Sequence, residues 1–377
     1  MQPKTIGLVA ASLLVAAATA KAEVAVDDVS VVTLPPASGP RLYVTDMAGL
    51  RPDGRIYVLD GTSLELLGQI PAGFTSFAEP SADGSKIYNA TTFHDRGVRG
   101  NKIDVLEEWN TSDLTLAQEV VLPPKRAMVV TYKDLLGLMN GGKRALVQNA
   151  TPASSVTVVD LANGAVVGEV DTAGCWAVMP SVSDPNRFAT ICGDGTFENI
   201  TLDDAGKAVK RARSAKIFDA QTDPIFIQSA SKGDTHYFVT FDGRLIGIDI
   251  SADTPTVTVD WKFTDGIDGG WRPGGYNPIA IHRDSDTIFV GMHANGGEGS
   301  HKLPAQEIWA LDLGSKTVTT RAPGHDALAI DVTQTGTPRV YALKGGVAIV
   351  ALDPANKLEP VGESEALFEL ASDFAVR

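Results

Sequence analysis

Short runs that alternate apolar and polar residues fill the chain, and helical periodicity is almost absent. One unit recurs: an alternating strand that ends near an acidic residue, a short polar turn and a second strand. Seven copies of its first strand occur, at residues 54–60, 104–110, 156–160, 197–203, 245–249, 308–312 and 347–353. The copies end about 41 to 63 residues apart, the length of a four-stranded propeller blade with its loops. The pattern predicts an all-β fold, a seven-bladed β-propeller with four-stranded antiparallel blades.

A second kind of segment lies between the copies, as in EPSADGSKIY at 79–88 and AIHRDSDTIFV at 280–290. Each reads as strand, tight polar turn and strand, and supplies the inner pair of a blade. Period-two alternation excludes an α/β fold and leaves an array of β-sandwiches as the structural alternative.

The first residues have the order of an export signal: Lys4, an apolar stretch at 6–20, and Ala20-Lys21-Ala22 at the cleavage point. We therefore expect a signal peptide at 1–22, a single propeller domain at 23–377 and a periplasmic location. A buried N-terminal helix is the alternative. No apolar run reaches the roughly 18 to 20 residues of a membrane span, so a membrane association is not expected.

The net charge of −14 becomes about −16 once Lys4 and Lys21 are removed. Nucleic-acid binding depends on a surplus of Lys and Arg, so a nucleic-acid partner is disfavoured. The negative charge would complement a basic patch on a protein partner, or it serves only to keep the protein in solution. The two cysteines, Cys175 and Cys192, should pair in an oxidising compartment, and neither has the histidine spacing of a zinc site.

In a four-stranded blade, the loop between strands two and three shares a face with the link to the next blade. The long insertions all fall in those positions, at 46–53, 93–102, 263–275 and 293–305. Loops that project together from a rigid scaffold usually form a binding surface. The alternative is that these insertions are neutral changes that the surface tolerates. Their residue types suit a protein interface, with Trp271, Arg272 and Tyr276 in one loop and His94, Arg96 and Arg99 in another. Packed turns with solvated arginines are the other interpretation.

A catalytic group within this chain is not evident. The sequence has no nucleophile elbow, P-loop or HExxH motif. His293, Glu298 and His301 share a loop, but their spacing matches no standard metal site, and we predict none. Function is therefore expected to depend on a partner chain.

Several ordered segments resemble one family, the heavy subunits of the quinoprotein amine dehydrogenases. They are TTFHDRGVRG at 91–100, LPPKR at 122–126, GCW at 174–176, ICGDG at 191–195, WRPGGY at 271–276 and EGSHK at 298–302, which contains His301. The resemblance implies a non-catalytic heavy chain in an α2β2 assembly. It also implies a small subunit that carries tryptophan tryptophylquinone and oxidises a primary amine to aldehyde and ammonia. A blue copper protein would accept the electrons, and no cofactor is expected in this chain.

The segments at 122–126, 148–153, 174–176 and 292–309 look closer to the aromatic amine branch than to the methylamine branch. Members of the family tend to place a phenylalanine near the mouth of the small subunit's pocket, in the loop that here reads DMAGLRP at 46–52. Met47 or Leu50 would take that place and shape substrate access, or the loop merely packs. A free-standing ligand-binding propeller without redox activity is the rival function.

Overall fold

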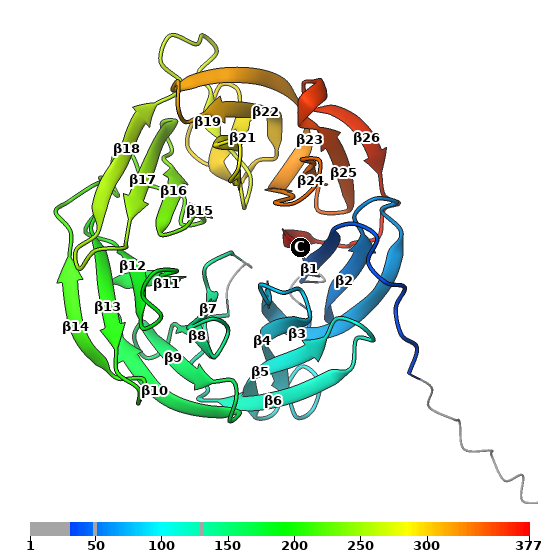
Figure 1. The fold of residues 1–377 in the computed structure, drawn as a ribbon, viewed down its shortest axis with the longest axis vertical. Helices are drawn as coiled ribbons and strands as arrows, with labels where there is room; N and C mark the ends of the chain where they lie inside the picture. The colour runs from blue at the N-terminus through cyan, green and yellow to red at the C-terminus, as the bar shows by residue number, and fades with distance from the viewer. Residues whose placement is uncertain (1–30, 48–50, 129–131) are drawn as a thin grey trace, which may run out of the picture. The chain divides into compact units, whose positions relative to one another are not determined.

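The computed structural model describes residues 31–47, 51–128 and 132–377, and the predicted signal peptide lies outside them. Two units are distinguished, Met1–Val32 and Thr33–Arg377, and the second holds the whole described fold. In its described residues, the Thr33–Arg377 unit is all-β apart from two short 3₁₀ helices, Ser300–Lys302 and Pro354–Asn356. Figure 1 shows its sheets following one another around a ring, as expected of a propeller.

Three sheets are separate four-stranded antiparallel units with their strands in chain order. They are β7 to β10 (Leu136–Met139, Arg144–Asn149, Ser155–Asp160, Ala165–Asp171), β11 to β14 (Cys175–Pro180, Arg187–Cys192, Phe197–Leu202, Ala208–Arg213) and β15 to β18 (Ala230–Lys232, Thr235–Val239, Arg244–Asp249, Thr256–Lys262).

The other strands form two larger sheets. One runs β27-β1-β2-β3-β4-β5-β6 (Ala371–Val376, Arg41–Asp46, Gly54–Asp60, Leu66–Pro80, Lys86–His94, Lys102–Asn110, Leu116–Leu122). The other contains β19 to β26 (Arg272–Pro273, Ile279–His282, Thr287–His293, Ala305–Asp312, Thr317–Val332, Val340–Lys344, Ala348–Asp353, Glu359–Glu363).

The sequence predicted four-stranded units throughout, and two long strands explain the larger sheets. The first part of β3 pairs with β2 and its second part with β4, while β23 joins β22 to β24 in the same way. The backbone turns within each strand, at Thr75 with φ 45° and at His325 with φ 52°. Each long strand therefore ends one group of four and begins the next.

All seven predicted repeat strands are confirmed as strands, namely β2, β5, β9, β13, β17, β22 and β25. Each is followed by the outermost strand of its group, and the outermost strands are the most exposed: β14 has one half-buried residue among six. The second strands are the most buried, and β8 and β12 are covered on both faces. Neighbouring sheets pack face to face, as where Leu146 and Val158 meet Phe188 and Ile200.

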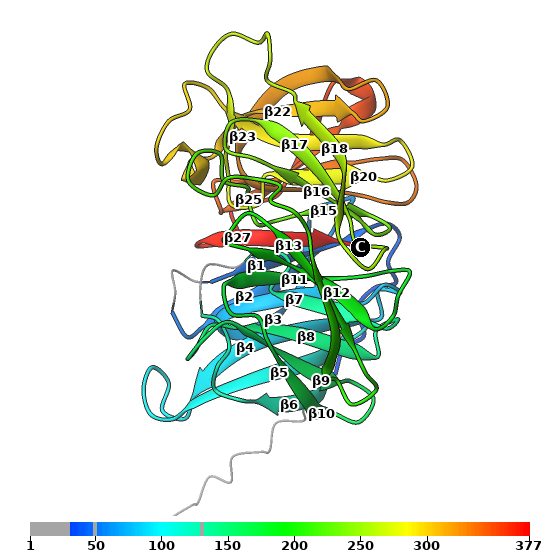
Figure 2. The same ribbon diagram turned by 90° about the vertical axis from the view of Figure 1, so that its left-hand side faces the viewer.

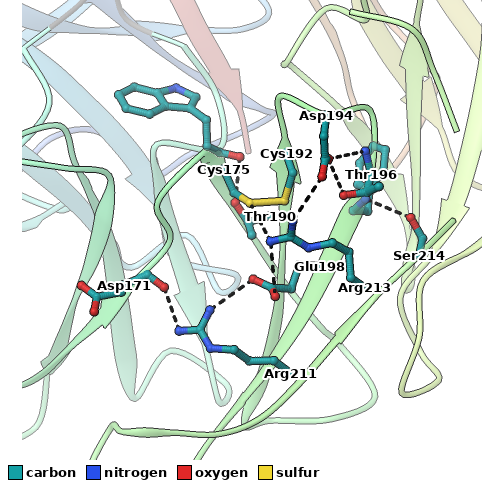
Figure 3. The surroundings of a disulfide bond; sticks show 12 residues. Asp171, Cys175, Thr190, Cys192, Asp194, Thr196, Glu198, Arg211, Arg213 and Ser214 are labelled. Carbon is teal, nitrogen blue, oxygen red and sulfur yellow. Dashed lines mark hydrogen bonds and ion pairs between the residues drawn. A yellow bond between two sulfur atoms is a disulfide. The ribbon is translucent and has the colours of Figure 1, made fainter. Parts of the chain in front are cut away.

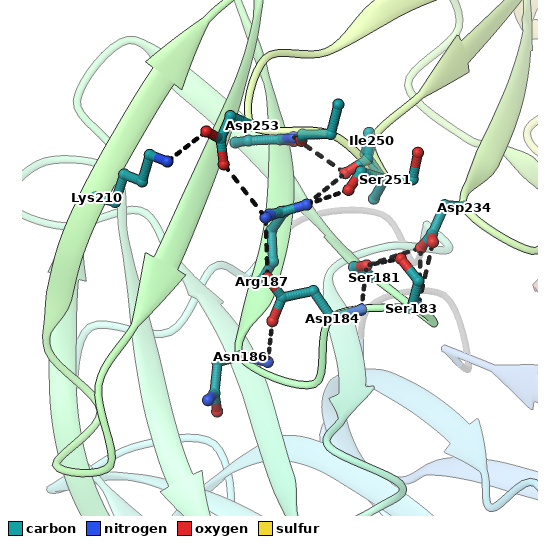
Figure 4. A network of polar contacts seen from close by, with 12 residues as sticks. Ser181, Ser183, Asp184, Asn186, Arg187, Lys210, Asp234, Ile250, Ser251 and Asp253 are labelled. Atoms are coloured by element: carbon teal, nitrogen blue, oxygen red, sulfur yellow. Dashed lines mark hydrogen bonds and ion pairs between the residues drawn. The ribbon is translucent and has the colours of Figure 1, made fainter.

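Polar ties also join neighbouring sheets. Arg187, at the start of β12, donates to the carbonyl of Ser251 and contacts Asp184 at 2.9 Å and Asp253 at 3.5 Å (Figure 4). Arg144, at the start of β8, donates in the same way to the carbonyls of Asp203 at 3.1 Å and Asp204 at 2.7 Å. In both cases the acceptor is the turn between the third and fourth strands of the next sheet.

Candidate functional site

The face that carries the long loops, called the insertion face below, is defined by the loops at 46–53, 93–102, 263–275 and 293–305. The structure places each between a second and a third strand or between consecutive sheets. In Figure 2 the cyan loop after β4 and the yellow loop after β21 project to the same side. The loops at 93–102 and 293–305 therefore lie on one face, as predicted.

The loops at 263–275 and 293–305 are ordered against each other by the backbone. The N–H groups of Asn295 and Gly296 donate to the carbonyls of Gly269 at 2.9 Å and Gly270 at 2.8 Å. Gly275 has φ 109°, and a Cβ there would lie 2.8 Å from the carbonyl oxygen of Leu328. Only glycine fits this close approach, so the glycines of the WRPGGY segment serve the shape of the loop.

Trp271 and Arg272 are half-buried and already engaged within the chain. The ring of Trp271 lies 5.5 Å from that of Trp309, and the Arg321 guanidinium stacks over both at 4.7 and 4.6 Å. Arg272 lies 4.3 Å from the ring centre of Phe241 and pairs with Asp242 at 2.9 Å. This arrangement holds two predicted interface side chains in fixed positions, which lowers the entropy cost of a contact with a partner.

A cavity of about 580 Å³ opens among the loops of the insertion face. Two of the predicted interface residues, Tyr276 and His301, line it. The imidazole of His301 meets the rings of Phe226 at 6.5 Å and Phe241 at 6.0 Å in edge geometry. The described residues that line it are Tyr132, Pro224, Ile225, Phe226, Ile227, Gln228, Phe241, Gly275, Tyr276, His301 and Lys302.

The other predicted interface residues lie at the end of β4 and in the loop after it, apart from this cavity. His94 is half-buried and packs edge-on against Phe74 at 5.4 Å. Arg96 and Arg99 are exposed, and the Arg96 N–H closes the turn by donating to the Arg99 carbonyl at 3.1 Å. Within the described residues, the ion pair of the Arg96 guanidinium is a long one, to Asp95 at 3.8 Å. The insertion face therefore carries two groups of predicted interface residues.

The two residues predicted to shape substrate access can be only partly described. Met47 is 3% exposed, and its N–H donates to the Leu370 carbonyl at 3.4 Å. Leu50 lies outside the described residues. Their role in substrate access stays a prediction.

The predicted disulfide is confirmed between Cys175 and Cys192, which lie opposite each other on β11 and β12. Both cysteines are at most 3% exposed. The Arg213 guanidinium contacts the sulfur of Cys175 at 3.6 Å, and Asp194 at 3.2 Å holds that guanidinium in place (Figure 3). The bond fastens the two innermost strands of its sheet near the insertion face.

A central ionic cluster is formed by Glu79 on β3, Asp331 on β23 and Asp373 on β27, together with Lys133 from the link between β6 and β7 and the terminal Arg377. Lys133 lies 3.5 Å from Asp331, and Arg377 lies 2.9 Å from Glu79. Burial is the main cause that raises the pKa of Glu79, and burial raises that of Asp373 to about 7 although Lys133 opposes it. The nearby carboxylates raise the pKa of Lys133 against the effect of burial.

This cluster holds the last strand. The Asn277 amide donates to Asp373 at 2.9 Å, and the Val376 N–H donates to Asp331 at 3.1 Å. Nearby, Asp134 accepts hydrogen bonds from Ser229, and burial raises its pKa to about 6. The cluster supplies mutual charge compensation, and within the described residues no group of three His, Cys, Asp or Glu side chains could hold a metal ion.

Sequence reasoning missed Phe226, Gln228 and Phe241, which complete the cavity. Phe241 occupies the turn between β16 and β17, and the other two lie in the link from β14 to β15. Both positions belong to the insertion face, so applying the same loop rule to short turns would have found them. Searching only for long insertions was too narrow a criterion for the cavity, because short turns on the same face also line it.

The chain matches the model of the family described as methylamine dehydrogenase heavy chain over residues 38–367. The chain belongs to this family. It is 28% identical to the methylamine dehydrogenase heavy chain of Methylorubrum extorquens, over 94% of this chain and 91% of that protein. It is 26% identical to the one from Methylophilus methylotrophus, over 84% and 78%.

Among solved structures, dihydro-heme d1 dehydrogenase NirN matches with a TM-score of 0.57 and 16% identity, over 89% of this chain and 74% of that one. This likeness concerns the fold alone. The family membership supports a heavy subunit of an amine-oxidising oxidoreductase. In the part of the chain that the structure describes, no helix is long and apolar enough to cross a membrane.

Proposed function

We propose that this protein is the non-catalytic heavy subunit of a periplasmic amine dehydrogenase, built as a seven-bladed β-propeller and exported with cleavage of residues 1–22. Its role is to hold a small subunit that carries tryptophan tryptophylquinone in an α2β2 assembly. That subunit converts a primary amine to aldehyde and ammonia and passes electrons to a blue copper protein. The observation that carries the proposal is the family match over residues 38–367.

The insertion face supports the choice of docking surface. Besides the fixed aromatic and basic side chains, exposed apolar residues occur in five loops that connect a second strand to a third or one group of four strands to the next, which are the positions of this face. These residues are Val98, Met128, Leu303, Val347 and Leu370, each at least 38% exposed. Apolar and aromatic groups surrounded by polar ones are the composition of a protein interface.

The proposal is tested by expressing the chain together with the short Trp- and Cys-rich reading frame expected beside its gene. We expect the two chains to purify together, with quinone absorbance in the complex and none in this chain alone. A chain that remains a lone monomer beside that product contradicts the proposal and favours the rival function, a free-standing binding propeller.

Arg96 and Arg99 test the position of the interface. Reversing both charges (Arg96→Glu with Arg99→Glu) should weaken capture of the small subunit at least tenfold, because exposed arginines steer and fix a protein contact. The matched control reverses Lys207 and Lys316, which lie in exposed turns between third and fourth strands. Pull-down titration measures both, and equal effects of the two pairs would place the interface elsewhere.

For the substrate we propose an aromatic amine, on the resemblance of the segments at 122–126, 148–153, 174–176 and 292–309. The methylamine-specific branch, to which the named relatives belong, is the alternative. Relative turnover of 2-phenylethylamine and methylamine by the complex decides between them.

Leu50 tests the predicted control of substrate access. Leu50→Phe should lower the rate with bulky amines relative to small ones, because the larger, stiffer ring narrows the opening. Assembly with the small subunit should be unchanged. Identical relative rates in the variant and the parent protein would show that residue 50 does not shape access.

A further inference from the structure

The cavity of the insertion face contains polar groups that the fold leaves unused. Gln228 is 3% exposed and lines the cavity, yet no hydrogen bond within the described residues engages its side-chain amide. Lys302 is exposed at the rim and forms no ion pair with another described residue. Because this amide borders the cavity and makes no hydrogen bond within the described fold, it is available to bind a ligand there.

The walls of the cavity are apolar and partly aromatic. Phe226 and Phe241 stand beside the imidazole of His301, and Pro224 and Ile225 continue the wall. The volume of about 580 Å³ lies within the range of small-molecule sites, which combine apolar walls with a few converging polar groups. The size and the apolar, aromatic walls therefore suit a small ligand with an aromatic body.

The charged residues of the lining indicate which charge the polar group of the ligand carries. Among the described residues of the lining there is no aspartate or glutamate, whereas Lys302 and His301 can both donate to an anion. Two aspartates adjoin lining residues in the sequence and are engaged elsewhere: Asp242 pairs with Arg272 at 2.9 Å, and Asp223 accepts a hydrogen bond from the Asp242 N–H at 2.8 Å. An amine would find no partner of opposite charge here, and a carboxylate would find at least one.

We propose that this cavity is a binding site for a small organic acid with an aromatic body. The ring lies against Phe226 and Phe241, the carboxylate faces Lys302 and His301, and the Gln228 amide donates the remaining hydrogen bond. The inference goes beyond the heavy-subunit function and uses residues of this chain only.

The test is calorimetric titration of the purified mature chain with phenylacetate. Two probes serve as comparisons: acetate has the same charge without the ring, and 2-phenylethylammonium has the ring with the opposite charge. Phenylacetate should bind at least tenfold more tightly than either. Binding no tighter than that of acetate, or tighter binding of the ammonium probe, would overturn the proposal.

Variants locate the site. Lys302→Gln should weaken phenylacetate binding about tenfold, the effect of losing about 1.4 kcal/mol of charge-assisted hydrogen bonding. Lys207→Gln removes a similar exposed charge elsewhere and should change nothing. Gln228→Leu keeps the bulk of the side chain and should weaken binding about fivefold, with the thermal unfolding midpoint as the check on folding. Equal binding by all three variants would remove the site from this cavity.

The same titration on the complex with the small subunit distinguishes a ligand-binding site from a cavity that the partner chain fills. Retained binding supports the proposal, and loss of binding on assembly overturns it, because the partner then fills the cavity. Failure of the amine dehydrogenase assignment would appear as missing quinone and missing partner, neither of which enters a titration of this chain alone.

Discussion

Arg126 shows how one residue of a family motif can serve the fold. It is 2% exposed, and its guanidinium donates to the carbonyls of Thr75 at 2.8 Å and Phe74 at 2.9 Å. Burial lowers its pKa to about 10, and Asp104 opposes that effect, so the side chain keeps its charge at neutral pH. Part of the resemblance at 122–126 therefore reflects the turn inside β3 rather than a choice of substrate.

Asp373 yields a prediction about pH. Its pKa of about 7 in the folded protein lies well above the ordinary value near 3.8. Between about pH 4 and pH 7 the folded protein holds a proton that the unfolded chain has released, so stability falls as the pH rises through this window. Asp373→Asn cannot ionise and keeps an oxygen for the Asn277 amide. Between pH 5 and pH 8 we expect the parent protein to lose on the order of 2 kcal/mol relative to this variant.

Urea unfolding at each pH measures the difference. Lys133, Asp331, Glu79 and Arg377 surround Asp373, and because they are present in both proteins their own titration largely cancels in the comparison. The exposed Asp284 offers a control, since Asp284→Asn should leave the pH dependence as it is. Parallel pH profiles for the Asp373→Asn variant and the parent protein would refute the assignment of the buried proton to this carboxyl.

At the scale of elements, the hydrogen bonds from Arg187 and Arg144 to the next sheet predict that these buried arginines stabilise the packing of neighbouring sheets. Arg187→Met should lower the free energy of unfolding by about 2 kcal/mol, because it removes hydrogen bonds from a charged donor that is 9% exposed. Lys210→Met is the matched control, because Lys210 pairs with the same Asp253 but is exposed on the outermost strand. Surface pairs contribute little, so similar losses in both variants would argue against the tie. Urea unfolding provides the values.

The elements that the sequence predicted best are those with a strict local pattern. Each apolar run that ends in an acid or amide, such as 156–160, is a strand because alternation and a polar turn occur together. The sequence did not reveal that β3 and β23 each belong to two groups. Gly73 also has left-handed backbone in β3, but Thr75 and His325 are residue types that do not by themselves indicate a turn. The cavity was missed for a related reason: its walls come from five separate segments whose approach only the fold creates.

At the scale of the molecule, β27 pairs with β1, so residues 371–376 complete the sheet that residues 41–46 begin. A chain that emerges from its N-terminus cannot finish that sheet until its last strand has emerged. The contact spans most of the sequence, and such distant pairing is slow to form. For a protein proposed to cross a membrane before it folds, this delay is useful: the unjoined β1 leaves the chain open to translocation and confines final closure to the far side.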